Sequence, residues 1–286
     1  MQPPTWSSLR IDPDDSHDAD HDADHDADHD ADHDADHDAD HGVVSIVLDR
    51  PDRLNALSQV LLRELIEACE WIDRQSTIKA VVVRGAGRAF SAGFDLADFT
   101  GGDGSAASAR QTADLGRLAT EALGGIGAIT IAALHGHCVG GGLVLASACD
   151  LRIAATDTRF SIPEVDLGIP LAWGGIPRLV RELGPAITKE LVLTCRVFDA
   201  DEAHRLRWLN RVVPADDLEA TALQLARDLG AKPTYALRTT KQQVNAVTEE
   251  MAGTGRNAAD ADSLVVAAGD PESKAAARAY LLRRKA

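Results

Sequence analysis

Two glycine-containing turns hold the residues of this chain that are best suited to do chemistry. The first lies in residues 89–96, Ala-Phe-Ser-Ala-Gly-Phe-Asp-Leu, and the second in residues 135–142, His-Gly-His-Cys-Val-Gly-Gly-Gly. Each turn leads from an extended run to the expected start of a helix, where backbone N–H groups have no partner within the helix. Two such turns facing each other would offer paired donors to a thioester carbonyl oxygen that gains negative charge.

Glu164 is the candidate acid–base group. It follows a proline and lies in a largely apolar segment that includes Phe160, Ile162, Val165 and Leu167. Apolar surroundings raise the pKa of a carboxyl group, which suits proton transfer near neutral pH. From these residues alone, a glutamate that caps a turn or pairs with an arginine is the alternative.

The elements that must position these groups alternate between strand and helix. We expect strands at residues 43–49, 80–83, 129–134 and 151–154, and helices at residues 55–73, 110–123 and 142–149. Such alternation favours an α/β fold with buried sheets. From residue 184 onward helical patterns dominate, and residues 220–229 form the clearest of them.

A low-complexity repeat accounts for most of the acidity of the chain. Residues 17–40 are His-Asp-Ala-Asp repeated six times, and their twelve aspartates reduce the net charge from -4 to -16. The repeat cannot form a core. Because residues 8–11 and 43–48 read as strands, we interpret it as a solvated loop that expands a hairpin turn. Weak binding of a divalent metal, remote from catalysis, is the alternative.

Composition narrows the function classes. The 286 residues include no apolar run long enough to span a membrane, no secretion signal and no basic region suited to nucleic acid. The four cysteines are widely spaced, with no CxxC pair. They are typical of buried thiols in a reducing compartment, which predicts a cytoplasmic protein without a metal site in its catalytic centre.

Several ordered sequence blocks together resemble the enoyl-CoA hydratase/isomerase (crotonase) family over about residues 43–244. The matching blocks are residues 48–51, 53–57, 90–96, 140–142, 149–150, 160–164, 167–170 and 174–175, together with Gly136. The resemblance implies a crotonase-like spiral core of ββα turns with a helical C-terminal region. It also implies homotrimers or dimers of trimers, and coenzyme A as part of an acyl-CoA substrate, with no other cofactor.

The resemblance divides the chain into four regions. They are an N-terminal strand region at residues 1–16, the repeat as a loop insertion at residues 17–41, the spiral core at residues 42–225 and the helical region at residues 226–286.

The resemblance also assigns site residues. It implies Ala92 and Gly141 as the oxyanion donors and Glu164 as the proton carrier. The implied substrate and coenzyme A contacts are Arg53, Leu54, Ala56, Ala92, Gly93, Phe94, Asp95, Gly141 and Trp173. Two alternatives stay open: Asp95 as a helix N-cap, and Lys241 as a phosphate contact or a solvated base.

Val144 departs from the family pattern. Hydratases of the family carry a second glutamate two residues after the glycine triplet, and two carboxylates then hold one water. With Val144 in that place, isomerisation by Glu164 alone is favoured in a pathway such as fatty acid metabolism. A hydratase of reduced or specialised activity and a non-catalytic acyl-CoA-binding protein are the alternatives.

Overall fold

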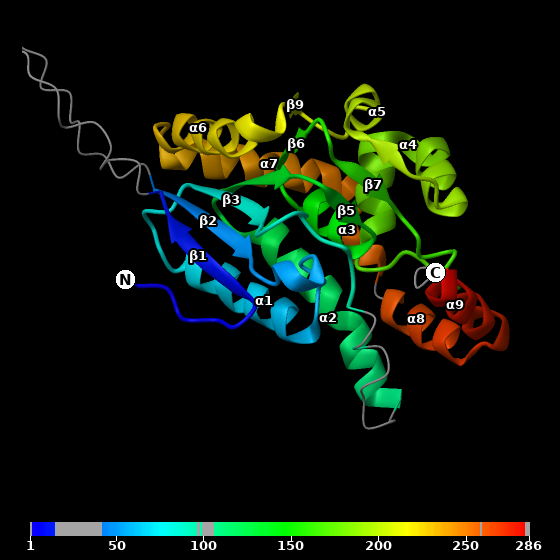
Figure 1. Cartoon of the computed structure of the whole chain (residues 1–286). Coiled ribbons are helices and arrows are strands. Elements are labelled where there is room, and N and C mark those ends of the chain that lie inside the picture. Colours follow the sequence, from blue (N-terminus) through cyan, green and yellow to red (C-terminus); the bar gives the residue numbers. More distant parts are fainter. Residues whose placement is uncertain (1, 15–41, 96–97, 99–105, 258, 284–286) are drawn as a thin grey trace, which may run out of the picture.

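The structure is a computed structural model that describes residues 2–14, 42–95, 98, 106–257 and 259–283 (Figure 1). Its main sheet has six strands in the order β1-β2-β3-β4-β6-β9. Only β1 is antiparallel to its neighbour, and the other pairs are parallel. The strands are β1 (Leu9–Pro13), β2 (Val43–Leu48), β3 (Ala80–Gly85), β4 (Ile129–Leu134), β6 (Leu151–Ala155) and β9 (Arg211–Val213).

β1 and β2 pair side by side across the repeat. The register runs from Leu9 opposite Leu48 to Pro13 opposite Val44, which confirms the predicted pairing. The loop insertion expected at residues 17–41 lies outside the described residues.

A second, smaller sheet supports the glycine turn. It consists of β5 (His137–Val139), β7 (Arg159–Ser161) and β8 (Phe198–Asp199), with β5 parallel to β7. The Gly140 N–H donates to the Ser161 carbonyl at 2.9 Å. The pairing therefore brings the turn at residues 140–142 beside the segment that leads to Glu164. These strands have only two or three residues, too few to show a periodic pattern.

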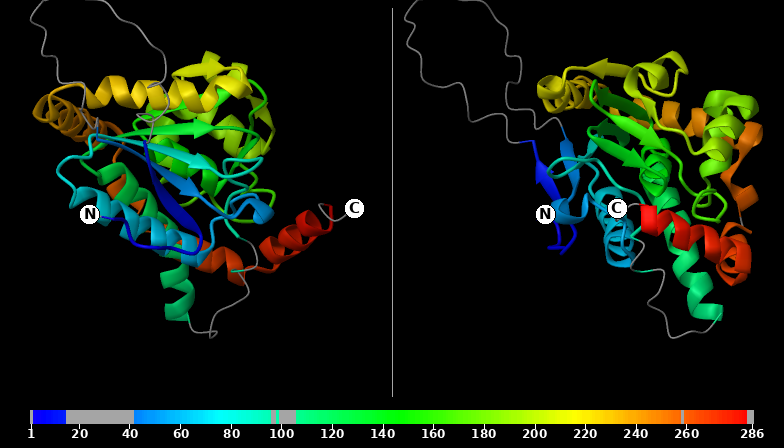
Figure 2. Two further views of the ribbon diagram at one scale, coloured as in Figure 1. Left: turned by 60° about the vertical axis from the view of Figure 1, so that its left-hand side comes forward. Right: turned by 45° about the vertical axis from the view of Figure 1, so that its right-hand side comes forward.

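Helices cover both faces of the main sheet. Val81 and Val83 of β3 belong to the core shared with α1, whereas Val82 belongs to the core shared with α6. Figures 1 and 2 show α6 along one face and α1 with α2 along the other. The α-helices are α1 (Gln59–Asp73), α2 (Ala106–Gly125), α3 (Gly141–Ala148), α4 (Gly175–Thr194), α5 (Ala200–Arg205), α6 (Leu218–Gly230), α7 (Thr234–Ala252), α8 (Asp260–Gly269) and α9 (Pro271–Arg283).

α1 starts four residues later than predicted. A short 3-10 turn, Pro51–Arg53, comes first, and Leu54 and Asn55 then have φ of 51° and 53°. Such left-handed residues cannot continue a right-handed helix. The helix starts after Ser58, whose Oγ accepts the Leu61 N–H at 3.2 Å, an N-cap contact.

α7 docks on the core through a buried ion pair. Lys241 Nζ lies 2.8 Å from Asp150 Oδ2 and donates to the Ala128 carbonyl at 2.8 Å. Asp150 Oδ2 also accepts the Thr130 N–H at 2.8 Å. Both readings of Lys241 from sequence, as a phosphate contact and as a solvated base, are therefore wrong, because its ammonium group is buried in the protein. None of the described helices is long and apolar enough to cross a membrane.

Candidate active site

Asn55 forms hydrogen bonds that connect its own loop to the segment that leads into the first glycine turn, at residues 89–96. Its Nδ2 donates to the carbonyls of Ala86 and Ala89 at 2.8 and 2.7 Å, and its Oδ1 accepts the Arg50 N–H at 2.9 Å. Its own carbonyl accepts the Ser91 hydroxyl at 2.8 Å. Asparagine suits this place because it tolerates the left-handed backbone better than most residues do.

The Ala92 amide is already committed within the protein. Its N–H donates to the Leu54 carbonyl at 2.8 Å, so the assignment of Ala92 as an oxyanion donor is wrong. Leu57 and the next residues then pair in parallel: Leu57 N–H donates to Gly93 O at 2.8 Å, and Asp95 N–H donates to Leu57 O at 3.1 Å. Since amides alternate in direction along an extended chain, the Phe94 N–H points to the side opposite Leu57.

Gly141 places its amide at the start of α3. Within the described part of the chain its N–H has no hydrogen-bond acceptor, as is usual in the first turn of a helix. Gly140 before it has φ of 51° and ψ of -119°, a backbone conformation that favours glycine. The two turns approach closely, because a Cβ added to Gly93 would lie 2.7 Å from Val139 O and 3.5 Å from Gly141 N.

The Glu164 carboxylate lies against the second turn. A Cβ added to Gly140 would lie 2.4 Å from its Oε1 and 3.2 Å from its Cδ. Part of the residue reaches the surface, but its Oε2 is buried and has no hydrogen-bond partner among the described residues. Burial raises the pKa of Glu164 from 4.5 to about 7, and a backbone hydrogen bond partly opposes the rise.

This raised pKa makes Glu164→Gln a stabilising substitution at alkaline pH. The folded chain binds the Glu164 proton more tightly than the unfolded chain does, so native stability falls as pH rises from 4.5 through 7. Removing that ionisation is expected to raise the free energy of unfolding by up to about 3 kcal/mol at pH 8. Urea denaturation at pH 8 and pH 4 checks this, and a gain of equal size at both pH values would contradict it.

Val144 takes no part in a second acid–base site. Its side chain is 1% exposed, and its Cγ2 would lie 2.8 Å from a Cβ added to Gly175. Among the described residues, no charged side chain contributes to the pKa of Glu164. Glu164 therefore lies without a carboxylate partner in the described site.

The predicted coenzyme A contacts lie in two neighbouring loops. Arg53 is exposed, and Leu54 and Ala56 are half-buried beside residues 92–95. Asp95 has a structural partner, because its Oδ2 accepts Arg50 Nη2 at 2.9 Å. Arg53 is thus the exposed cation of this loop, whereas Arg50 is half-buried and paired with Asp95.

Trp173 lies beside Gly141. A Cβ added to Gly141 would lie 2.4 Å from Cζ3 of the indole, and the Phe94 ring meets that indole edge-on at 5.7 Å. The sequence placed Trp173 at the site but not the residues that hold it, namely Thr120, Arg178 and Asp260. Thr120 and Asp260 are distant from Trp173 along the chain, so no local pattern could have identified them, whereas Arg178 follows Trp173 by only five residues.

The comparisons with known proteins agree with this arrangement. The sequence model described as enoyl-CoA hydratase/isomerase matches residues 38–286. The chain belongs to the enoyl-CoA hydratase/isomerase family. A probable enoyl-CoA hydratase of Mycobacterium bovis is 38% identical over 213 residues, which cover 73% of this chain and 80% of that protein.

Relatives within the family carry different activities in their names. The mitochondrial Delta(3,5)-Delta(2,4)-dienoyl-CoA isomerase of Homo sapiens is 35% identical over 70% of this chain and 64% of its own. The crystal structure of an enoyl-CoA hydratase/isomerase from Xanthobacter autotrophicus Py2 superposes with a TM-score of 0.78 at 33% identity, covering 85% of this chain and 94% of that one. The chain is thus an enzyme of this family with its α/β crotonase fold, as predicted.

Proposed function

We propose that this family member isomerises an enoyl-CoA, with Glu164 as its only proton carrier. The observation that carries the proposal is one carboxylate, with pKa raised to about 7 by burial, that lies against Gly140, the residue before the Gly141 amide, and has no second carboxylate at residue 144. A single base that accepts and returns one proton is sufficient for a 1,3-shift of a double bond.

The reaction begins with the Glu164 carboxylate taking a proton from C2 of a 3-enoyl thioester. The electron pair of that C–H bond moves into the conjugated system, and negative charge develops on the thioester oxygen. The protonated Glu164 then returns the proton at C4, which leaves the double bond between C2 and C3. Substrate and product have the same atoms, so no oxidant or further reactant is needed.

The Gly141 N–H is the proposed principal donor to the thioester oxygen, helped by the positive end of the α3 dipole. As second donor we propose Phe94 in place of Ala92. Its N–H points away from Leu57, in the turn that approaches Gly141. Since both donors are main-chain groups, they are fixed before substrate binds and need no rearrangement during the reaction.

The remaining contacts belong to coenzyme A, which enters as part of the substrate and is the only cofactor group that we propose. Exposed Arg53, with Leu54 and Ala56, forms the rim of the turn at residues 92–95. An arginine at this rim suits the phosphates of a coenzyme A thioester.

Hydration of a 2-enoyl-CoA is the second candidate, because hydratases are among the relatives. Against it, Val144 offers no oxygen to hold the attacking water. The assay that separates the two uses crotonyl-CoA and a 3-enoyl-CoA, following the absorbance of the conjugated thioester. Gain of absorbance from the 3-enoyl-CoA supports isomerisation. Loss from crotonyl-CoA at a higher kcat/KM would establish hydration instead.

The pH dependence of isomerisation should report the ionisation of Glu164. The base must be deprotonated in the free enzyme, and its pKa is about 7. We therefore expect kcat/KM to fall about tenfold per pH unit below pH 7 and to level off above it. Initial rates between pH 5 and pH 9 measure the profile, and a rate that stays constant down to pH 5 would remove Glu164 as the base.

Assembly into trimers or pairs of trimers is also proposed. Three apolar residues of α7, Val244, Val247 and Met251, are more than half exposed and follow helical spacing. Such a face usually marks a contact between proteins. Sedimentation equilibrium of the full chain should give a mass three or six times that of the 30.3 kDa protomer, and a monomer at micromolar concentration would contradict this.

A further inference from the structure

We propose that Trp173 is a specificity-determining residue that restricts this enzyme to short acyl groups. The inference rests on the proposed function, because it takes the Gly141 amide as the place of the thioester carbonyl. It concerns which acyl-CoA enters the site, whereas the proposed function concerns which proton moves.

The Trp173 indole fills a slot between two helices. A Cβ added to Gly116 of α2 would lie 1.9 Å from its Cε2, and one added to Gly141 of α3 would lie 2.4 Å from its Cζ3. A side chain at either position would collide with the ring. The indole is thus inserted between two glycine backbones, and Trp173 is only 7% exposed.

The Trp173 slot lies where the acyl group of the substrate, and not its coenzyme A portion, would contact the indole. A thioester carbonyl at Gly141 has two substituents, and the coenzyme A portion must lead outward to solvent. The acyl group therefore leads inward, where C2 to C4 lie within reach of Glu164. Trp173 and Phe94, whose rings meet at 5.7 Å and 86°, occupy the buried side next to Gly141. Carbons beyond C4 then have to compete with the indole for space.

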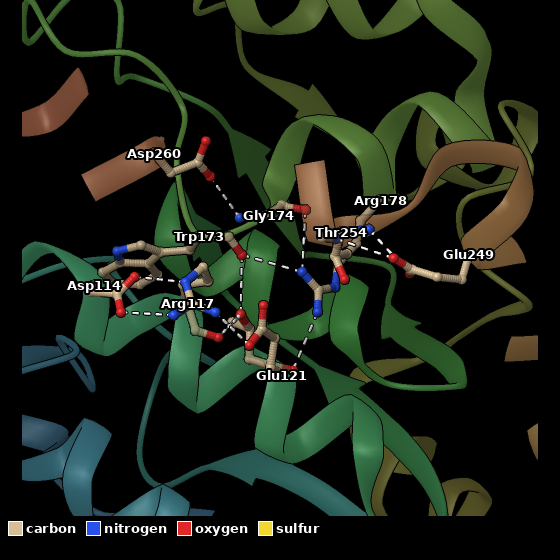
Figure 3. Close-up of polar contacts among 11 residues, drawn as sticks. Asp114, Arg117, Glu121, Trp173, Gly174, Arg178, Glu249, Thr254 and Asp260 are labelled. Atoms are coloured by element: carbon tan, nitrogen blue, oxygen red, sulfur yellow. Dashed lines mark hydrogen bonds and ion pairs between the residues drawn. The ribbon is translucent and has the colours of Figure 1, made fainter. Parts of the chain in front are cut away.

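Hydrogen bonds from three helices fix the backbone that carries the indole. The Trp173 carbonyl accepts Thr120 Oγ1 of α2 at 3.0 Å and Arg178 Nη1 of α4 at 3.2 Å. The next amide, of Gly174, donates to Asp260 Oδ2 of α8 at 3.0 Å. Figure 3 shows Arg178 of α4 and Asp260 of α8 pointing toward Trp173 and Gly174.

The backbone conformation of Trp173 also shows that its surroundings hold this residue in place. Its φ is 60°, a conformation that costs energy for a bulky residue and persists only where the surroundings impose it. The ring is therefore a fixed part of the described site, and a longer acyl chain would have to break these contacts to displace it.

The test compares wild type with Trp173→Ala on 3-enoyl-CoA substrates of four, six, eight and ten carbons. For wild type we expect kcat/KM to fall at least about tenfold from four to eight carbons. For the variant we expect the ratio of eight-carbon to four-carbon kcat/KM to rise at least about tenfold, because the emptied slot accepts methylene groups. If the alanine variant does not fold, Trp173→Leu replaces it in the test. Trp173→Phe, which keeps an aromatic ring, is the matched control, and its ratio of eight-carbon to four-carbon kcat/KM should rise less than that of the alanine variant.

Binding provides a measurement that does not require turnover. Dissociation constants of saturated acyl-CoA esters of four to ten carbons, from calorimetry, should show the same preference for short chains and the same shift in the variant. If no substrate turns over but this binding pattern appears, the proposed function fails while the role of Trp173 stands. Wild type that prefers eight or ten carbons, or a variant with an unchanged profile, would overturn the role of Trp173.

Discussion

Glu164→Gln is expected to reduce kcat for double-bond isomerisation by at least about a thousandfold. Glutamine keeps the shape of the side chain but cannot accept the C2 proton. Among the described residues, no charged side chain shifts the pKa of Glu164, so we expect no neighbouring base to replace it. The dissociation constant of a saturated acyl-CoA should change less than about tenfold, because the Gly141 amide and the loop at residues 53–56 are intact. Initial rates and calorimetry measure the two quantities separately.

The matched control for this substitution is Asp166→Asn, which removes a carboxylate two residues away on the exposed side of the same segment. Its kcat should stay within about twofold of wild type, as for a surface change remote from the chemistry. Turnover by Glu164→Gln within about tenfold of wild type would show that another group carries the proton.

Lys241→Ala is expected to lower the free energy of unfolding by about 3 kcal/mol, which is typical for breaking a buried pair by removing one partner. The substitution leaves Asp150 charged beside its Thr130 hydrogen bonds and leaves the Ala128 carbonyl without its ammonium donor. Urea denaturation followed by circular dichroism provides the measurement.

Two further variants serve as controls for the stability loss expected in Lys241→Ala. Lys189→Ala removes an exposed lysine of α4 and should change stability by less than about 0.5 kcal/mol. The double variant Lys241→Met with Asp150→Asn removes both charges and should be more stable than Lys241→Ala alone. A loss in Lys241→Ala no larger than in Lys189→Ala would mean that the pair contributes nothing to the docking of α7.

Local patterns in the sequence predict the elements well where apolar residues decide them. The strand Ile129–Leu134 has the predicted bounds, because a run of apolar residues in a central strand is buried on both faces. The start of α1 was predicted less well, because the left-handed Leu54 and Asn55 depend on contacts with the segment at residues 86–91. Nothing in the neighbouring residues encodes that approach.

At the candidate site too, some features follow from the local sequence and others depend on contacts between distant segments. Glycine spacing places Gly141 at the start of α3 and beside the first turn. The direction of an amide depends on strand pairing, however, and the bond from Ala92 to Leu54 spans two loops that only the fold brings together. Lys241 shows the same limit, because its partner Asp150 lies about ninety residues earlier in the chain.

The position of the pairing between β1 and β2 has a consequence for how this chain varies. The chain leaves the main sheet at Pro13, the end of β1, and returns to it at Val43, the amino end of β2. The loops that carry the candidate catalytic groups follow the carboxyl ends of the strands, at the opposite edge of the sheet. Because doubling the length of a connection costs only about 0.6 kcal/mol, we expect variants with more or fewer repeat units between β1 and β2 to keep the turnover of wild type.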